Sequence, residues 1–122
     1  MVVNMEKPKI PNVSLFMVDQ LRFDAFGCYG NTQIHTPNID SIALNGSTFD
    51  NHFIQNPVCS PSRCSILTGR YPKNHGTRDN GIPLRDEEIT LPEMLRDSGY
   101  LTAAIGKMHF TSFNARLIIS SN

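Results

Sequence analysis

The chain lacks the features that mark several classes of protein. Its 122 residues carry 11 Lys and Arg against 11 Asp and Glu, so charge gives no argument for nucleic acid or an acidic membrane as a partner. No stretch approaches the ~20 consecutive apolar residues of a membrane-spanning helix. Residues 1–11 hold charges and prolines where a signal peptide has an apolar core, so the sequence predicts a cytoplasmic protein.

Cysteine is scarce as well, with Cys28, Cys59 and Cys64 alone. Three cysteines do not make a disulfide framework of the kind that holds small secreted domains together. Cys59 and Cys64 could in principle bind a metal, but no second Cys/His pair has the spacing of a zinc site. The length fits one small domain or part of a larger one.

Residues 57–69 are the most informative segment, reading Pro-Val-Cys-Ser-Pro-Ser-Arg-Cys-Ser-Ile-Leu-Thr-Gly. The pattern predicts a short helix. Ser60 suits the N-cap, Pro61 suits the first helical position, where its missing N–H costs nothing, and Gly69 suits the residue that ends the helix.

Cys59 would then lie just before a helix N-terminus, where free N–H groups and the helix dipole favour an anion. Arg63, one turn into the helix, can add a planar fork of donors to the same anion. The arrangement indicates a reactive sulfur beside a pocket for a tetrahedral oxyanion. Taken alone, Cys59 could equally be a small buried hydrophobe, as most free cysteines are.

Two strand-like segments end in candidate site residues. Residues 12–18 are mostly apolar, as in a central strand of a parallel sheet, and Asp19 and Gln20 follow at the carboxyl end, where ligands gather. Their oxygens suit a hard divalent cation such as calcium or magnesium. A lone aspartate after a strand more often simply begins a loop.

The second segment runs from Gly99 and includes a predicted strand over 100–105. If the extended backbone continues, Lys107 and His109 point to one face and Met108 to the other, because side chains alternate with period two. A lysine and a histidine on one side can hold a tetrahedral anion and protonate a leaving oxygen. The alternative is a solvated lysine and a partly buried histidine.

The rest of the chain alternates between predicted helices and strands. Helices are expected over 36–46 and over 90–99, where Thr90 and Glu93 have capping-box spacing, and a strand over 47–54. This order favours an α/β fold with a partial parallel sheet and flanking helices.

Residues 70–89 are rich in Gly, Pro, Asn and charge, so they read as a long surface loop. His75 and Arg78 lie in it. Both are interpreted as loop residues and not as catalysts.

These segments together resemble the sulfatase family. The matching residues are the run from Gly99 to His109 and Cys59, Pro61, Ser62, Arg63, Ile66, Leu67, Thr68 and Gly69. The resemblance implies that 1–122 is the N-terminal fragment of a sulfatase catalytic domain with the fold of the alkaline phosphatase superfamily. It also implies that a formylglycine-generating enzyme oxidises Cys59 to formylglycine.

By resemblance, the function is hydrolysis of a small-molecule sulfate ester. Hydrated formylglycine at position 59 attacks sulfur, Arg63 and Lys107 hold the charged oxygens, and His109 helps the alcohol to leave. Attack through a covalent intermediate splits one difficult displacement into two easier ones.

The resemblance further implies a divalent metal, with calcium expected, bound by Asp19, Gln20 and the modified Cys59. Sulfatases commonly have Asp-Asp where this chain has Asp-Gln, as in some phosphonate monoester hydrolases. Hydrolysis of a phosphonate or phosphate monoester is therefore one alternative. The other is an inactive fragment, because the family's remaining ligands come from later in a far longer chain.

Overall fold

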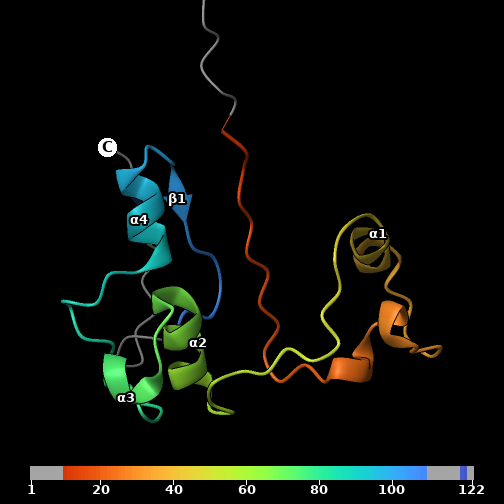
Figure 1. The fold of residues 1–122 in the computed structure, drawn as a ribbon, viewed down its shortest axis with the longest axis horizontal. Helices are drawn as coiled ribbons and strands as arrows, with labels where there is room; N and C mark the ends of the chain where they lie inside the picture. Colours follow the sequence, from red (N-terminus) through yellow and green to blue (C-terminus); the bar gives the residue numbers. More distant parts are fainter. Residues whose placement is uncertain (1–9, 110–118, 121–122) are drawn as a thin grey trace, which may run out of the picture. The chain divides into compact units, whose positions relative to one another are not determined.

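The computed structural model describes residues 10–109 and 119–120. The chain divides into two compact units, Met1–Thr48 and Phe49–Asn122, each of which has its own internal contacts (Figure 1). No helix in the described ranges is long and apolar enough to cross a membrane.

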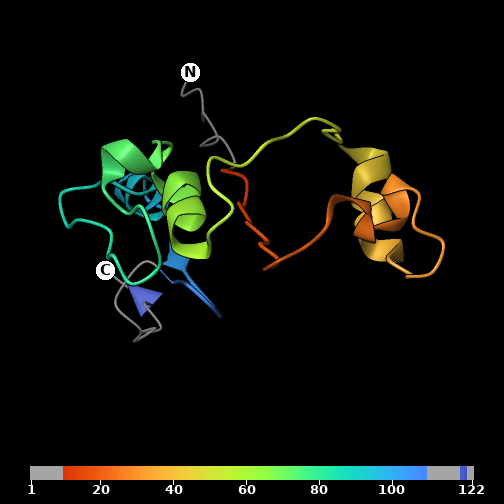
Figure 2. The ribbon, with the colours of Figure 1, turned by 90° about the horizontal axis from the view of Figure 1, so that it is seen from below.

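In the first unit, helix α1 (Pro37–Asn45) packs against the short 3-10 turn η2 (Gly27–Tyr29) (Figures 1 and 2). A second 3-10 turn, η1 (Phe23–Ala25), packs against η2 in its turn. The predicted helix over 36–46 is confirmed, with a proline in its first turn.

A small polar cluster joins η2 to α1. The Asp40 carboxylate accepts hydrogen bonds from the Cys28 N–H at 2.8 Å and from the Thr36 hydroxyl at 3.0 Å, and the Thr36 oxygen accepts from the Gly27 N–H at 2.9 Å. A Cβ at Gly27 would lie 2.5 Å from Asp40 Oδ2, so a larger residue at position 27 would have to displace this carboxylate.

The strand predicted over 12–18 is absent. These residues have no regular structure, and Phe16 is 89% exposed. A strand is stabilised by ladder hydrogen bonds and by packing on its faces, and the described residues supply neither to this segment. The predicted strand over 47–54 is absent for the same reason.

In the second unit, helix α2 (Cys59–Thr68) packs against α3 (Pro72–His75) and α4 (Leu91–Asp97), and α4 packs against strand β1 (Thr102–Ala103). Strand β1 pairs antiparallel with β2 (Ile119–Ser120).

The predicted parallel sheet is not formed by the part of the chain that the structure describes, since its one ladder is this antiparallel pair. The strand expected over 100–105 is present only as Thr102–Ala103. A parallel sheet needs crossover connections and cover on both faces. It therefore remains a prediction for a complete domain.

Helix α2 begins earlier than the sequence suggested. Its N-cap is Val58, its first residue is Cys59, and Pro61 is the third residue. The first four N–H groups of a helix have no intrahelical partner, so a proline is tolerated there and its position did not fix the start. The end was predicted correctly: Gly69 adopts a left-handed conformation (φ 67°), and its N–H donates to the Ser65 carbonyl at 2.9 Å.

The interior of the second unit is mainly polar. Its buried apolar residues, among those described, are Pro61 and Cys64, whereas the buried polar side chains are Ser60, Arg63, Ser65, His75, Thr77 and Glu88. Three of them, His75, Thr77 and Glu88, belong to the segment predicted as a surface loop, which also contains α3. That prediction was wrong because composition does not reveal which polar groups have buried partners.

The predicted capping box of α4 is confirmed. Glu93 accepts hydrogen bonds from the Thr90 N–H at 2.8 Å and from the Thr90 hydroxyl at 2.7 Å. These bonds lower the pKa of Glu93 below its usual 4.5, with the hydroxyl as the larger cause. The stabilisation is therefore present above about pH 4.5 and is lost as the pH falls through the folded-state pKa.

We expect Thr90→Ala to weaken the start of α4 by about 1 kcal/mol, because the cap is lost. Amide hydrogen exchange within Leu91–Asp97 should then be about fivefold faster at neutral pH, while Thr90→Ser, which keeps the hydroxyl, should stay near the parent rate. Equal exchange in the parent and in Thr90→Ala would contradict this assignment.

Candidate functional site

The N-terminus of α2 is the centre of the candidate site. Cys59, half-buried, is the first residue of the helix. Just beside it, the Ser60 N–H donates to Asn80 Oδ1 at 3.1 Å, and the Val58 N–H donates to Asn56 Oδ1 at 2.8 Å. Two side chains from outside the helix thus fix the backbone on either side of the cysteine.

Lys107 lies beside that cysteine. Its Nζ is 3.8 Å from Cys59 Sγ, although the two residues are 48 positions apart. Arg63 is buried, with 8% of its surface exposed, and its guanidinium donates to the Lys107 carbonyl at 2.6 Å. The structure therefore brings three predicted site residues together, and Arg63 holds the backbone that carries the lysine.

This arrangement suits an anion at the end of α2. An ammonium group, a guanidinium and the positive end of a helix dipole all stabilise negative charge close to the side chain of residue 59. Burial of Arg63 strengthens its interaction with charge, because less water screens it.

His109 is placed differently from the expectation. Its φ is +58°, which is left-handed and not extended, so the period-two alternation does not continue through Lys107, Met108 and His109. The prediction of a shared face on that basis was wrong, because β1 already ends at Ala103. His109 Nδ1 is buried without a hydrogen-bond partner among the described residues. Such an atom costs about 1–3 kcal/mol unless a partner is supplied.

The predicted metal ligands fall in both units. Asp19 and Gln20 lie in the first, at a turn where Gln20 has φ 55°, and Cys59 lies in the second. No group of three or more acidic, His or Cys side chains that could hold a metal occurs in the residues described. Carboxylate and amide oxygens are suitable ligands for a hard cation, but two residues are too few for the roughly 6–8 oxygens that calcium prefers. Binding of calcium by Asp19, Gln20 and residue 59 stays a prediction.

Sequence reasoning missed two supports of the site. Asn80 precedes Gly81, and Asn-Gly is a strong turn signal, but nothing local showed that its side chain reaches α2 twenty residues away. The contact of His75 with Ser65 on α2 was missed because His75 was assigned to a surface loop.

Comparisons with known proteins agree on one family. The family model described as Sulfatase matches residues 11–116. The chain is 41% identical over 107 residues to an N-acetylglucosamine-6-O-sulfatase of Bacteroides thetaiotaomicron, covering 88% of this chain and 19% of the relative. It is 41% identical over 112 residues to human steryl-sulfatase (81% and 19%), and 44% identical over 101 residues to an arylsulfatase of Clostridium perfringens (81% and 21%).

One solved structure is similar too, a phosphonate monoester hydrolase of Agrobacterium radiobacter. The TM-score is 0.63 at 36% sequence identity, over 67% of this chain and 16% of that one. The likeness supports a common fold for the matched part. The chain spans about a fifth of the length of the curated relatives it matches.

Proposed function

The chain belongs to the sulfatase family, and from that premise we propose that it carries the nucleophile and part of the anion site of an enzyme that hydrolyses a sulfate ester. The observation that supports this most is the contact of Lys107 Nζ with Cys59 Sγ at 3.8 Å, at the N-terminus of α2. This contact joins segments 57–69 and 99–109, whose motifs predicted the family.

Each residue has a distinct task in this proposal. Cys59 presents the position that attacks sulfur, at the positive end of a helix. Lys107 stabilises charge on the sulfate oxygens as it grows in the transition state. Arg63 holds the Lys107 backbone and adds positive charge from the interior. His109, whose Nδ1 has no hydrogen-bond partner among the described residues, supplies a ring nitrogen for the proton of the departing alcohol.

Two groups complete the proposal. Sulfatases generally use formylglycine and a divalent metal, and here Cys59 would be the precursor of the first, while Asp19 and Gln20 would contribute oxygens to the second. When present, formylglycine would supply an aldehyde hydrate, a hydroxyl nucleophile whose second hydroxyl allows the sulfate to be released again. A formylglycine-generating enzyme is accordingly the expected partner in maturation.

Hydrolysis of a phosphonate monoester is the second candidate. It is favoured by Gln20 in place of an aspartate and by the structural likeness to a phosphonate monoester hydrolase. Both esters present a tetrahedral anion, so Lys107 and Arg63 would serve either reaction.

A chimera tests the proposal. Residues 11–116 replace the matching segment of the Clostridium perfringens arylsulfatase, to which the chain is 44% identical, and a formylglycine-generating enzyme is co-expressed. We expect turnover of an aryl sulfate, an aldehyde at position 59 by peptide mass spectrometry, and an unmodified thiol at Cys64, which lacks a proline two residues on.

The control is Cys59→Ala in the same chimera, which should fold and have no turnover. A folded chimera that carries the aldehyde yet turns over no ester would contradict the proposal. Faster turnover of an aryl phosphonate than of the aryl sulfate would support the second candidate instead.

A further inference from the structure

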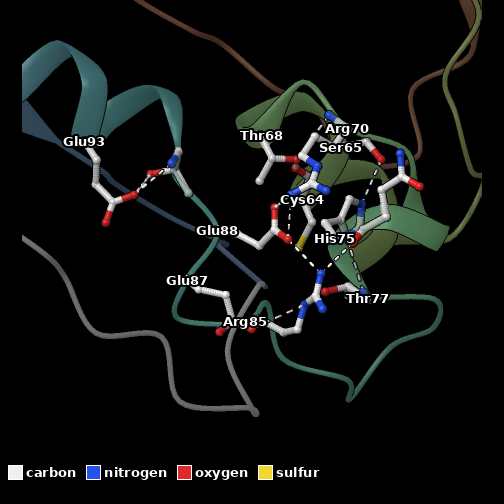
Figure 3. A network of polar contacts seen from close by, with 12 residues as sticks. Cys64, Ser65, Thr68, Arg70, His75, Thr77, Arg85, Glu87, Glu88 and Glu93 are labelled. Carbon is white, nitrogen blue, oxygen red and sulfur yellow. Dashed lines mark hydrogen bonds and ion pairs between the residues drawn. The ribbon is translucent and has the colours of Figure 1, made fainter.

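His75 is held between two hydrogen bonds inside the second unit. The ring is fully buried, Nδ1 lies 3.2 Å from the Thr77 N–H, and Nε2 lies 3.1 Å from Ser65 Oγ (Figure 3). Because a backbone N–H can only donate, Nδ1 must be the acceptor and carries no proton. The neutral ring therefore has its proton on Nε2, which donates to the Ser65 hydroxyl.

The groups around the ring oppose a second proton. Burial lowers the pKa of His75 from its usual 6.5, the Glu88 carboxylate acts in the opposite sense, and Arg70 and Arg85 add to the lowering. Glu88 itself is 2% exposed and accepts from Arg70 at 2.7 Å and from Arg85 at 2.8 Å, so two cations already neutralise it (Figure 3).

Helix α2 depends on such polar contacts. Its buried residues are Ser60, Pro61, Arg63, Cys64 and Ser65, so little apolar surface is available to fix the helix by packing. The side chain of Ser65 contacts His75, which is ten residues farther along the chain, at the end of α3. A buried hydrogen bond of this kind fixes the orientation of one helix face.

We propose that His75 is a positioning residue, which in its neutral Nε2–H form holds Ser65 and so keeps α2, the helix that carries Cys59 and Arg63, in its working position. A proton added at Nδ1 would face the Thr77 N–H, so that bond would break and a buried cation would lie beside Arg70 and Arg85. The relevance to catalysis rests on the proposed function, whereas the positioning itself does not.

Cys64 offers a direct readout in the chain of 122 residues. It is 0% exposed, lies next to Ser65, and is neither a proposed catalyst nor a ligand. A thiol reagent is applied in pulses at several values between pH 7.5 and pH 5, and the rate at which Cys64 is modified is measured. Protection is the ratio of this rate in the urea-unfolded chain to the rate in the folded chain at the same pH. Trypsin cuts after Arg63 and Arg70, so the peptide 64–70 reports Cys64 alone.

We expect Cys64 of the parent to be protected at pH 7.5. Because the folded ring resists the proton that the unfolded ring accepts, protection is full above about pH 6.5 and falls, by up to about tenfold per pH unit, toward the folded-state pKa. A merely structural contact that does not titrate would give a flat profile.

Two variants separate the two bonds. His75→Gln places an amide donor near the position of Nε2 and cannot titrate, so protection at pH 7.5 should persist and the profile should be flat. His75→Asn reaches the Thr77 N–H but not Ser65, and should lower protection at least about tenfold at every pH, because a buried hydroxyl loses its partner. His52→Gln, at an exposed histidine of the same unit, should match the parent.

Three results would overturn the proposal. They are a parent profile that is flat or unprotected throughout, a His75→Gln profile with the parent slope, and equal protection in His75→Gln and His75→Asn. None of these measurements requires a sulfate ester. A failure here is therefore distinct from a failure of the chimera to turn over substrate.

Discussion

Lys107→Ala is expected to lower kcat/KM of the active chimera by about 10²–10³, the usual cost of removing one preorganised donor from developing negative charge. Lys107 Nζ is 3.8 Å from Cys59 Sγ, so it borders the position where the sulfate oxygens would lie. Since Arg63 bonds the main-chain carbonyl of residue 107, which alanine keeps, the local backbone should survive. Steady-state kinetics with an aryl sulfate measures the loss.

The matched control is Met108→Leu, the adjacent residue. It exchanges one half-buried apolar side chain for another of similar volume, so its effect on kcat/KM should be small. Equal losses of kcat/KM in the two variants would mean that activity depends on the structure of this segment and not on the Lys107 ammonium group. A fall in kcat with KM unchanged would show that Lys107 stabilises the transition state and not the bound substrate.

The helices were predictable because their signals are local. A proline in the first turn marks α1, Gly69 ends α2, and the reciprocal bonds of Thr90 and Glu93 begin α4. The predicted strands over 12–18 and 47–54 are absent, and the strand over 100–105 is reduced to Thr102–Ala103, because a strand needs partners that are distant in sequence. Residues 12–18 have the composition of a central strand and no ladder among the described residues.

In the candidate site too, the local motifs were predictable and the contacts between distant segments were not. The motif around Cys59 and the segment ending at His109 each indicated an anion-binding role, but no local pattern gave the 3.8 Å contact that joins Lys107 to Cys59. The prediction that Lys107 and His109 share one face assumed an extended chain, whereas the backbone of His109 is left-handed. His75 was missed because a buried histidine and an exposed one look alike in sequence.

The chain of 122 residues on its own, with an aldehyde at position 59, is expected to turn over no aryl sulfate even in excess calcium. Asp19, Gln20 and residue 59 give too few of the roughly 6–8 oxygens that calcium needs, and the curated relatives are about five times as long as the segment they share with this chain.

The same chain should bind an apolar dye strongly, because large hydrophobic side chains are exposed in both units, with Phe16 at 89%, Leu44 at 86% and Ile105 at 87%. Dye binding and protection of Cys64 should coexist, since the polar contacts around His75 do not depend on those surfaces.

The chimera, carrying the same aldehyde, serves as the positive control for turnover. Turnover by the isolated chain that Cys59→Ala abolishes would show that these residues suffice for catalysis, and that the metal is bound by fewer ligands than its chemistry favours.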